Sequence, residues 1–545
     1  MLPLSQLEVL AVDCQATAAR PRGHLLELGW ARVCPAGTRA QARLIKLPDH
    51  ERIPPGVFRI TGISESMTRD GVEGPAAWRE LSDLASRLAQ QPAPTVAHFA
   101  RFEQPFLCAL AGGAPPLDIV CTHEIARRLL PDLPRCSLRA LTGYFGRSVG
   151  PLRRSADHVE ATVFLWRELV RLLDAEGVST WGALHEWLAA PAGRAKRRGR
   201  VWPMPRDARL SLPDAPGLYR LQRTSGDVLY IGKASSLHRR VNSYFRKQHG
   251  VPERMLEMLS QVRAVSYEIA PSALEAALLE PDEIKRHRPP YNVALTDDRE
   301  LWFTPPDLSE RSPHACPRCS VGPFPSAQWL DHFGALARGS RAALGSDRWA
   351  ADPETFNAGY ARFRAAHGEL ARNDAAPHSR LLHVGTRLWW EGRRDCDAVS
   401  DDASETATNR EAPTWTPENV QFSLERLALR AALARRRARW LTRMVDAAVA
   451  WTEPGATRGR LIVIDNGEII ARGSVEPGAI PPIPPGHRRP VAERHEAFTV
   501  ARFDRLRVLT TELKRLASEG GPVALRFGES PVLAGARLAY ALSWV

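Results

Sequence analysis

The amino-acid sequence predicts a multidomain α/β protein, with an α/β domain at the N-terminus, a small α/β module in the centre and a mixed α+β region at the C-terminus. Three observations predict this fold class. The chain has 545 residues, a length that suits three or four domains of ordinary size. Short apolar runs alternate with helical patterns through the first 172 residues. A second set of strand-like and helical segments follows a basic, proline-containing linker.

The separate segments follow from the period of their hydropathy. Residues 7–14 and 25–33 predict strands, and 76–91 predict a helix. In the centre, 217–222 and 227–232 predict two strands that flank a Thr-Ser-Gly-Asp turn, with helices after them.

The C-terminal region also contains recognisable elements. An apolar stripe at helical spacing predicts a basic helix over 421–451. Alternating apolar residues around Asn466-Gly467 predict a hairpin over 460–473. The composition of 397–408 predicts a loop or a disordered stretch.

These patterns place the expected boundaries. We expect an N-terminal domain over 1–175, a basic linker over 176–210, a compact module over 211–295, a connecting region over 296–410 and an α+β domain over 411–545. A basic linker is usually only solvated, but it also offers contacts to phosphates. The candidate DNA-binding residues of the linker are Arg194, Lys196, Arg197, Arg198 and Arg200.

Charge and composition restrict the class of function. Lysine and arginine number 74 against 61 acidic residues, and the formal net charge is +13. This balance favours a polyanionic partner, most often nucleic acid. With 44% hydrophobic and 25% charged residues, the composition excludes wholesale disorder. No apolar run approaches the ~20 residues of a membrane span. The N-terminus lacks the pattern of a signal peptide, so we expect a cytoplasmic protein without membrane contact.

The central module carries the pattern that is most specific for chemistry. Hydrolysis of a phosphodiester needs a deprotonated water, a Lewis acid at the phosphate and help for the leaving oxygen. A single carboxylate is enough to anchor one Mg²⁺ that keeps most of its water ligands, and an arginine fork suits a phosphate. The residues concerned are Gly217, Tyr219, Tyr230, Gly232, Lys233, Arg240, Tyr244, Glu280 and Asn292.

The alternative is that Tyr219 and Tyr230 simply pack as a cross-strand pair. That alternative does not account for Lys233, Arg240 and Glu280 occurring together.

The order of these residues resembles the GIY-YIG nuclease family, in the branch formed by the N-terminal domain of the excinuclease UvrC and its relative Cho. The resemblance covers roughly 80 residues and includes YIGKA, RRVNSYF and RPPYN. It implies that Tyr230 relays a proton from water, with Tyr219 as second choice or as the residue that orients it. It also implies that Arg240 stabilises charge on the phosphate.

The same resemblance implies roles for the remaining residues and for partners. Glu280 would hold one Mg²⁺ or Mn²⁺, and Lys233 would lower the pKa of a tyrosine or contact phosphate. Tyr244 and Asn292 would complete the hydrogen-bond network. DNA would be the substrate, and UvrA and UvrB would be the loading partners.

The N-terminal region resembles the DEDDh exonucleases of the polymerase III epsilon type, which have an RNase H-like fold. Segments such as AVDCQATA, VAHFARFEQPFL and RRSADHVEAT carry this resemblance. That chemistry uses two metal ions held by four carboxylates, with a histidine as general base. We expect an inactive, structural or DNA-binding domain, because the matching positions hold Asp13, Gln15, Glu103, Arg153 and His158.

The connecting region contains a Cys-x-x-Cys pair, Cys316 and Cys319. A structural zinc site needs four donors, and no further donor stands at ligand spacing. We therefore expect a tight turn with free thiols rather than zinc.

The catalytic residues predict a phosphodiesterase, and the resemblance to UvrC and Cho implies a structure-directed DNA endonuclease of nucleotide excision repair. The Cho resemblance implies that it nicks damaged DNA on the 3′ side of the lesion. Two alternatives remain open. One is an active 3′–5′ exonuclease of the epsilon type, and the other is a non-catalytic DNA-binding repair adaptor.

Overall fold

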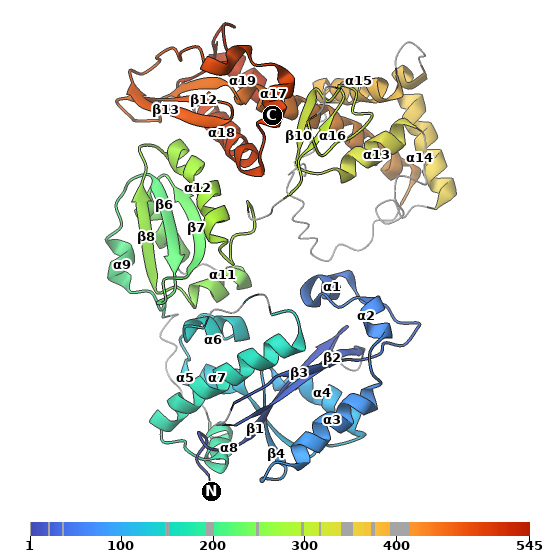
Figure 1. Ribbon diagram of the computed structural model, residues 1–545, viewed down its shortest axis with the longest axis vertical. Coiled ribbons are helices and arrows are strands. Elements are labelled where there is room, and N and C mark those ends of the chain that lie inside the picture. The colour runs from blue at the N-terminus through green and yellow to red at the C-terminus, as the bar shows by residue number, and fades with distance from the viewer. Residues whose placement is uncertain are drawn as a thin grey trace.

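The computed structural model describes residues 2–545 except 20–21, 35–36, 148–149, 151, 192–200, 247–249, 296–298, 316–317, 339–351, 372–375 and 393–414. Within the described residues, the strands form four sheets that follow one another along the chain (Figure 1). The five candidate linker residues and Cys316 lie outside the described residues, as does the predicted loop over 397–408.

The N-terminal domain is built on a mixed five-stranded sheet of order β3-β2-β1-β4-β5. Strand β1 (Val9–Ala16) pairs antiparallel with β2 (Leu25–Val33), which pairs antiparallel with β3 (Gln41–Leu44). On its other side β1 runs parallel to β4 (Ala93–Ala97), and β4 runs parallel to β5 (Leu117–Cys121). This is the RNase H-like arrangement expected from the sequence.

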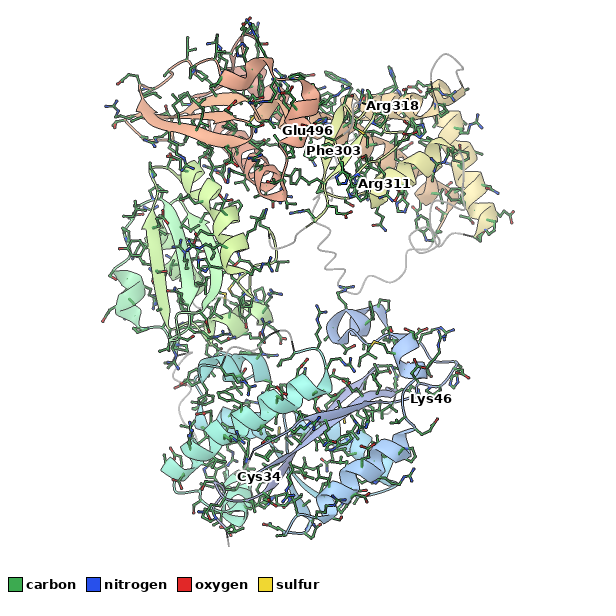
Figure 2. All side chains as sticks on the ribbon, viewed as in Figure 1. Cys34, Lys46, Phe303, Arg311, Arg318 and Glu496 are labelled. Carbon is green, nitrogen blue, oxygen red and sulfur yellow. The ribbon has the colours of Figure 1, made fainter. Side chains whose placement is uncertain are left out.

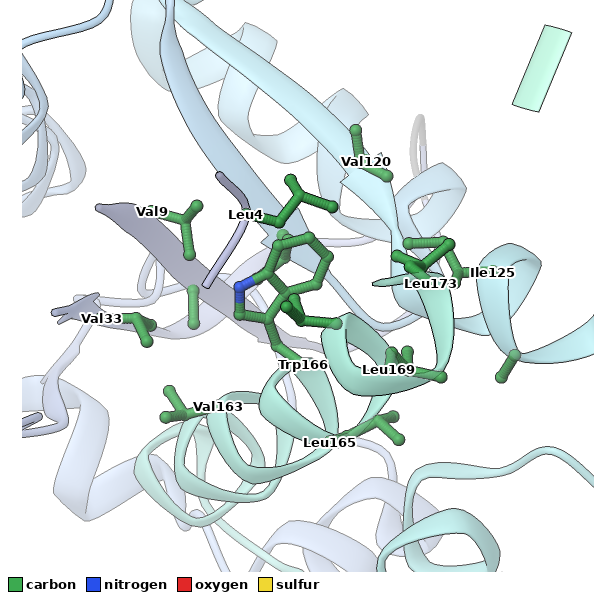
Figure 3. Packing of buried hydrophobic residues seen from close by; sticks show 14 of the residues in the cluster. Leu4, Val9, Val33, Val120, Ile125, Val163, Leu165, Trp166, Leu169 and Leu173 are labelled. Atoms are coloured by element: carbon green, nitrogen blue, oxygen red, sulfur yellow. The ribbon is translucent and has the colours of Figure 1, made fainter. Parts of the chain in front are cut away.

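Helices cover both faces of this sheet, because β1 is apolar on both sides. Val9 packs against α7 (Ser155–Ala175), whose Trp166 lies in the centre of that core (Figure 3). The next residue, Leu10, points the other way and packs with α3 (Gly74–Ser86) and α4 (Ala100–Ala111).

The described residues of this domain form five further helices. One of them, α8, falls within the range expected for the linker, yet Trp181 and Leu184 bury its apolar face in the N-terminal core. The five helices are α1 (Pro55–Thr61), α2 (Glu65–Arg69), α5 (Thr122–Leu129), α6 (Leu138–Tyr144) and α8 (Trp181–Ala189).

The central domain is a small antiparallel sheet of order β7-β6-β8. Leu218 and Ile231 face α12, where Ile284 packs on them, while Tyr219 and Leu221 face α10 and α11. The two strands and the turn predicted here are confirmed. The elements are α9 (Arg206–Leu210), β6 (Gly217–Gln222), β7 (Val228–Ala234), α10 (Leu237–Tyr244), α11 (Glu253–Leu259), β8 (Ala264–Ile269) and α12 (Ala273–His287).

A helical region follows the central domain and shares one long helix with the C-terminal domain. Two short strands precede it, and on the first of them Phe303 is buried, while Arg311 lies 4.5 Å from the ring of Trp302 (Figure 2). The elements are β9 (Trp302–Thr304), β10 (Val321–Phe324), α13 (Gln328–Ala337), α14 (Pro353–Ala366), a 3₁₀ helix (Gly368–Ala371), α15 (Pro377–Trp390) and α16 (Pro417–Met444).

The C-terminal domain is an antiparallel sheet of order β13-β12-β11-β14-β15. Its helix α18 packs on α12 of the central domain through Leu274 and Leu278. The elements are β11 (Ala447–Trp451), β12 (Gly459–Asp465), β13 (Glu468–Val475), a 3₁₀ helix (Pro485–Arg488), α17 (Val491–Glu496), α18 (Val500–Ser518), β14 (Val523–Arg526), β15 (Leu533–Ala534) and α19 (Gly535–Ser543).

Of two predictions for the C-terminal region, the hairpin is confirmed and the end of the long helix is wrong. The hairpin is confirmed, with Asn466 and Gly467 at φ 52° and 76° in its turn. The helix expected to reach residue 451 instead ends at Met444, and Ala447–Trp451 form a central strand that is buried throughout. An alanine-rich apolar run fits a buried strand as well as a buried helix, so hydropathy alone does not separate them. Among the described residues, no helix has the length and apolar character of a membrane span.

Candidate active sites

The two strand tyrosines of the central domain lie on one face of the sheet. Tyr219 stands opposite Gly232, and Tyr230 stands opposite Leu221. Directly paired residues of antiparallel strands point to the same side, so the tyrosines are diagonal neighbours rather than a direct cross-strand pair. A Cβ atom on Gly232 would lie 2.4 Å from the Tyr219 hydroxyl oxygen. The glycine therefore leaves the space that the Tyr219 ring occupies.

Helix α10 adds a third tyrosine to this face. The ring centroids of Tyr219, Tyr230 and Tyr244 are each 6.2 Å from one another. The hydroxyls of Tyr219 and Tyr244 share a hydrogen bond of 2.6 Å. One turn earlier on α10, the guanidinium carbon of Arg240 lies 5.1 Å from the Tyr244 ring. The structure thus brings together three phenols and one cation from two strands and a helix.

The environment of these phenols opposes their ionisation. Burial raises the pKa of Tyr219 and of Tyr230, and the nearby Tyr244 hydroxyl raises both further. The positive charge of Arg240 acts in the opposite direction but does not reverse the shift. Both hydroxyls therefore keep their protons at neutral pH and are donors as well as acceptors.

Glu280 approaches the end of β7 from α12. Its Oε1 accepts a hydrogen bond of 3.2 Å from the backbone N–H of Lys233. Burial raises the pKa of this carboxyl, the charge of Lys233 offsets part of that rise, and the charge of Glu512 adds to it. Pro281 lies inside the helix rather than at its start, and Ser272 caps the helix N-terminus.

Lys233 points away from the tyrosines. It pairs with Leu218 in the ladder, on the face opposite to Tyr230. Its ammonium forms an ion pair with Glu512 of α18, and Arg515 donates a 2.8 Å hydrogen bond to the same carboxylate. Among the phenols, Arg240 is a cation that lowers the pKa of Tyr219 and Tyr230, and a role of Lys233 in lowering the pKa of a tyrosine stays a prediction.

Two further predicted residues, Asn292 and Gly217, fix the positions of backbone segments in the sheet. The side-chain amide of Asn292 accepts from Ile231 N–H and donates to Ile231 C=O, both at 2.9 Å. Because β7 is an edge strand, this clamp takes the place of a neighbouring strand. A Cβ atom on Gly217 would lie 2.3 Å from the carbonyl oxygen of Glu268 on β8, so the glycine allows the close approach of these two strands.

Glu512 is a residue of this site that sequence reasoning missed. It lies 279 positions from its partner, in a region without a recognisable motif. No sequence signal pointed to it.

The N-terminal domain gathers some of the residues expected for an exonuclease centre. The Gln15 amide donates to Asp13 Oδ2 at 2.9 Å, and His158 Nδ1 lies 3.2 Å from Asp13 Oδ1. Burial lowers the pKa of His158, but the charge and hydrogen bond of Asp13 outweigh it, so the pKa is raised overall. Arg153 is exposed and outside this group.

Glu103 completes this group without restoring a metal site. It is 3% exposed, and burial followed by the charge of Asp13 raises its pKa well above the ordinary range. Burial therefore favours the protonated form of this carboxyl over the ionised form that would bind a metal ion. Across the described parts of the chain, no three His, Cys, Asp or Glu side chains gather as metal ligands. The donor set around Asp13 does not fit the two-metal centre of the exonucleases.

One residue of the predicted Cys-x-x-Cys pair, Cys319, differs from expectation. Cys319 is buried and disulfide-bonded rather than a free thiol. A sulfur in a disulfide is not a thiolate and offers zinc no ligand.

Comparison with known proteins supports both resemblances. Residues 215–293 match the family model of the UvrC-like GIY-YIG domain. A Mycobacterium tuberculosis protein described as a "putative bifunctional exonuclease/endonuclease protein" is 30% identical over 321 residues, which are 54% of this chain and 48% of that protein. UvrABC system protein C of Sphingopyxis alaskensis is 41% identical over 128 residues, covering 21% of this chain and 19% of its own. The matches thus span less than half the length of these relatives.

Two solved structures resemble single domains. The GIY-YIG N-terminal endonuclease domain of UvrC from Thermotoga maritima, bound to magnesium, is 33% identical and covers 16% of this chain and 94% of its own, with a TM-score of 0.15. Exonuclease X, in complex with 5′ overhanging duplex DNA, is 22% identical and covers 31% and 93%, with a TM-score of 0.24. The family model and the sequence relatives confirm that the chain joins an exonuclease-like domain to a UvrC-like GIY-YIG nuclease domain.

Proposed function

We propose that this chain is a structure-directed DNA endonuclease of nucleotide excision repair, which nicks damaged DNA on the 3′ side of the lesion. The observation that carries the proposal is the cluster of Tyr219, Tyr230, Tyr244, Arg240 and Glu280 within the domain that matches the UvrC-like family model. Loading by UvrA and UvrB, and action in the cytoplasm, are proposed by resemblance to UvrC.

A single divalent cation, Mg²⁺ or Mn²⁺, suits the residues present. Glu280 is a half-buried carboxylate with one oxygen engaged by the Lys233 N–H, which leaves its other oxygen for a cation that keeps water ligands. When bound, such a cation supplies a Lewis acid for the phosphate. Glu280 must be ionised to hold it, so its raised pKa sets the acid limit of activity.

The side chains of the protein supply proton transfer, orientation and charge stabilisation. Tyr230 keeps its proton at neutral pH, so it acts as a relay that passes on a proton rather than as a base that is ionised beforehand. Tyr219, hydrogen-bonded to Tyr244, orients that relay. Arg240, beside the same phenols, stabilises charge on the phosphate in the transition state.

The N-terminal domain is proposed to bind DNA or to support the fold without cleaving. Its Asp13 carboxylate is occupied by His158 and Gln15, and burial raises the pKa of Glu103, which favours its protonated form. Both conditions oppose the binding of two metal ions.

One experiment tests these assignments. The full chain is incubated with Mg²⁺ and lesion-bearing duplex, nicked duplex or single-stranded DNA, with and without UvrA and UvrB. We expect Glu280→Ala and Tyr230→Phe to abolish nicking and Asp13→Ala to leave it unchanged. Stepwise shortening of 3′ ends that survives Glu280→Ala but is lost with Asp13→Ala would establish an exonuclease instead. Absence of cleavage on every substrate would favour the adaptor.

A further inference from the structure

A cleft lined by arginines lies between α16 and α19, outside the nuclease site. Its volume is about 620 Å³. Thirteen residues line it, and none of the thirteen has an acidic side chain. The main-chain oxygen of Val545, one of the lining residues, accepts a 2.7 Å hydrogen bond from Arg437. Its cationic residues are Arg435, Arg436, Arg439, Arg443 and Arg537.

In the described part of the chain, these arginines have no ion pairs of the kind that neutralise other arginines of the same domain. Arg489 pairs with Asp446 and Asp465, and Arg505 pairs with Glu468 and Asp282. No described carboxylate forms an ion pair with any of the five arginines in the cleft. An arginine-rich composition alone does not explain this contrast, because it applies equally to both sets.

The spacing of the arginines on α16 adds an electrostatic cost. Arg435, Arg439 and Arg443 follow one another at four-residue steps, a spacing at which like charges on a helix repel. Burial and then the charge of Arg439 lower the pKa of Arg435, and the charge of Asp307 offsets part of that fall. A bound polyanion would remove this repulsion.

Aromatic side chains border the cleft. Trp544 stacks on Trp389 with ring centroids 3.4 Å apart, and Arg436 lies 4.0 Å from the Trp544 ring. Tyr540 lines the cleft and is 46% exposed. The ring centroid of Trp390 lies 6.2 Å from that of Tyr540, and Trp390 is 61% exposed. Arginines next to exposed aromatic faces are the combination that binds unpaired nucleotides, through phosphate contacts and base stacking.

We propose that this cleft binds single-stranded DNA, with the arginines on backbone phosphates and with Tyr540 and Trp390 stacking on bases. A second cleft of about 450 Å³ contains Lys233 of the nuclease domain and shares Val545 with the arginine cleft. A strand held by the arginines would thus continue towards the nuclease domain. The assignment of DNA as the ligand rests on the proposed function.

Binding is tested in full-length protein that carries Glu280→Ala, so that no cleavage is needed. The anisotropy of a short fluorescein-labelled DNA single strand is measured over a range of NaCl concentrations. Arg439→Ala/Arg537→Ala removes two exposed arginines that form no hydrogen bond or ion pair with the side chain of any described residue. We expect affinity to fall by tenfold or more, and the slope of log affinity against log salt to decrease by about 1.4, or ~0.7 for each lost phosphate contact.

The matched control is Arg458→Ala/Arg472→Ala. It removes the same charge from exposed positions at β12 and β13 that do not line the cleft, and the salt slope should stay unchanged. As a second probe, Tyr540→Ala should weaken binding by about tenfold at an unchanged salt slope, because stacking involves no counterion release.

Three results would overturn the proposal: a cleft variant that keeps the affinity and salt slope of its parent, a control that loses as much as the cleft variant, or a parent that binds duplex but not single strands. Nicking is assayed separately with Glu280 intact. Unchanged nicking with no effect on binding refutes only the cleft, and intact cleft binding without nicking refutes only the nuclease.

Discussion

Replacing Gly232 with alanine tests whether the space around Tyr219 is required for catalysis. The added Cβ atom would lie 2.4 Å from the Tyr219 hydroxyl oxygen and 2.9 Å from Cε1 of Tyr230. Ordinary contact begins at 3.4 Å, so the hydroxyl must move by about 1 Å. A displacement of that size at a catalytic group costs on the order of 10²-fold in rate.

The same substitution has a cost in stability. Forcing an extra methyl into a packed site costs about 1–3 kcal/mol. Loss of the 2.6 Å bond between Tyr219 and Tyr244 adds about 1 kcal/mol. We therefore expect the central domain to be destabilised by about 2–4 kcal/mol and to remain folded under mild conditions.

The assay is the single-turnover rate of nicking with Mg²⁺ on lesion-bearing duplex, together with thermal unfolding followed by circular dichroism. The matched control is Gly473→Ala on β13, where an added Cβ atom meets nothing within 4 Å. The control should nick at the parent rate. A Gly232→Ala protein that also nicks at the parent rate would refute the assignment of Tyr219 to the catalytic cluster.

Three further predictions concern buried charges. Glu512→Gln removes a charge that raises the pKa of Glu280, so the acid limb of the pH–rate profile should move to lower pH, and an unmoved limb would contradict the coupling. Asp13 raises the pKa of His158 above its ordinary value, so the contribution of this ion pair to the stability of the N-terminal domain should be fully present below pH 6.5 and should be lost as pH rises through the folded pKa. His158→Asn should flatten that decline in thermal unfolding measured against pH. Glu27→Ala leaves the start of α7 without its buried carboxylate partner and should cost about 3 kcal/mol in urea unfolding, whereas a neutral result would show that the pair is not needed.

Local patterns were sufficient for much of the fold. The strands around Tyr219 and Tyr230, the Asn466-Gly467 hairpin and the strand β1 all follow from periodicity and turn chemistry, which depend on neighbouring residues. The end of α16 did not follow, because Ala447–Trp451 are buried in a sheet. That environment is created by β12 and β14, which lie further along the chain.

Part of the candidate site could likewise be predicted from local patterns, and part of it could not. The nuclease motif was visible because its residues recur at set spacings within about 80 positions. The contact between Lys233 and Glu512 was not visible, because it spans 279 positions between domains. The altered exonuclease positions were visible as changes of residue type. Their consequence, an Asp13 carboxylate held by His158 and Gln15, was not.

The sequence by itself determined which chemical groups this protein has: three tyrosines, an arginine and a carboxylate in the central domain, and too few carboxylates in the N-terminal one. Only the tertiary structure decided which partner each charge takes. It pairs Lys233 with Glu512 and pairs Arg489 and Arg505 with carboxylates. Among the described residues, it provides no carboxylate partner for the arginines of the α16–α19 cleft. The physical reason is that electrostatic interactions depend on distance and burial in space, and separation along the chain does not determine either.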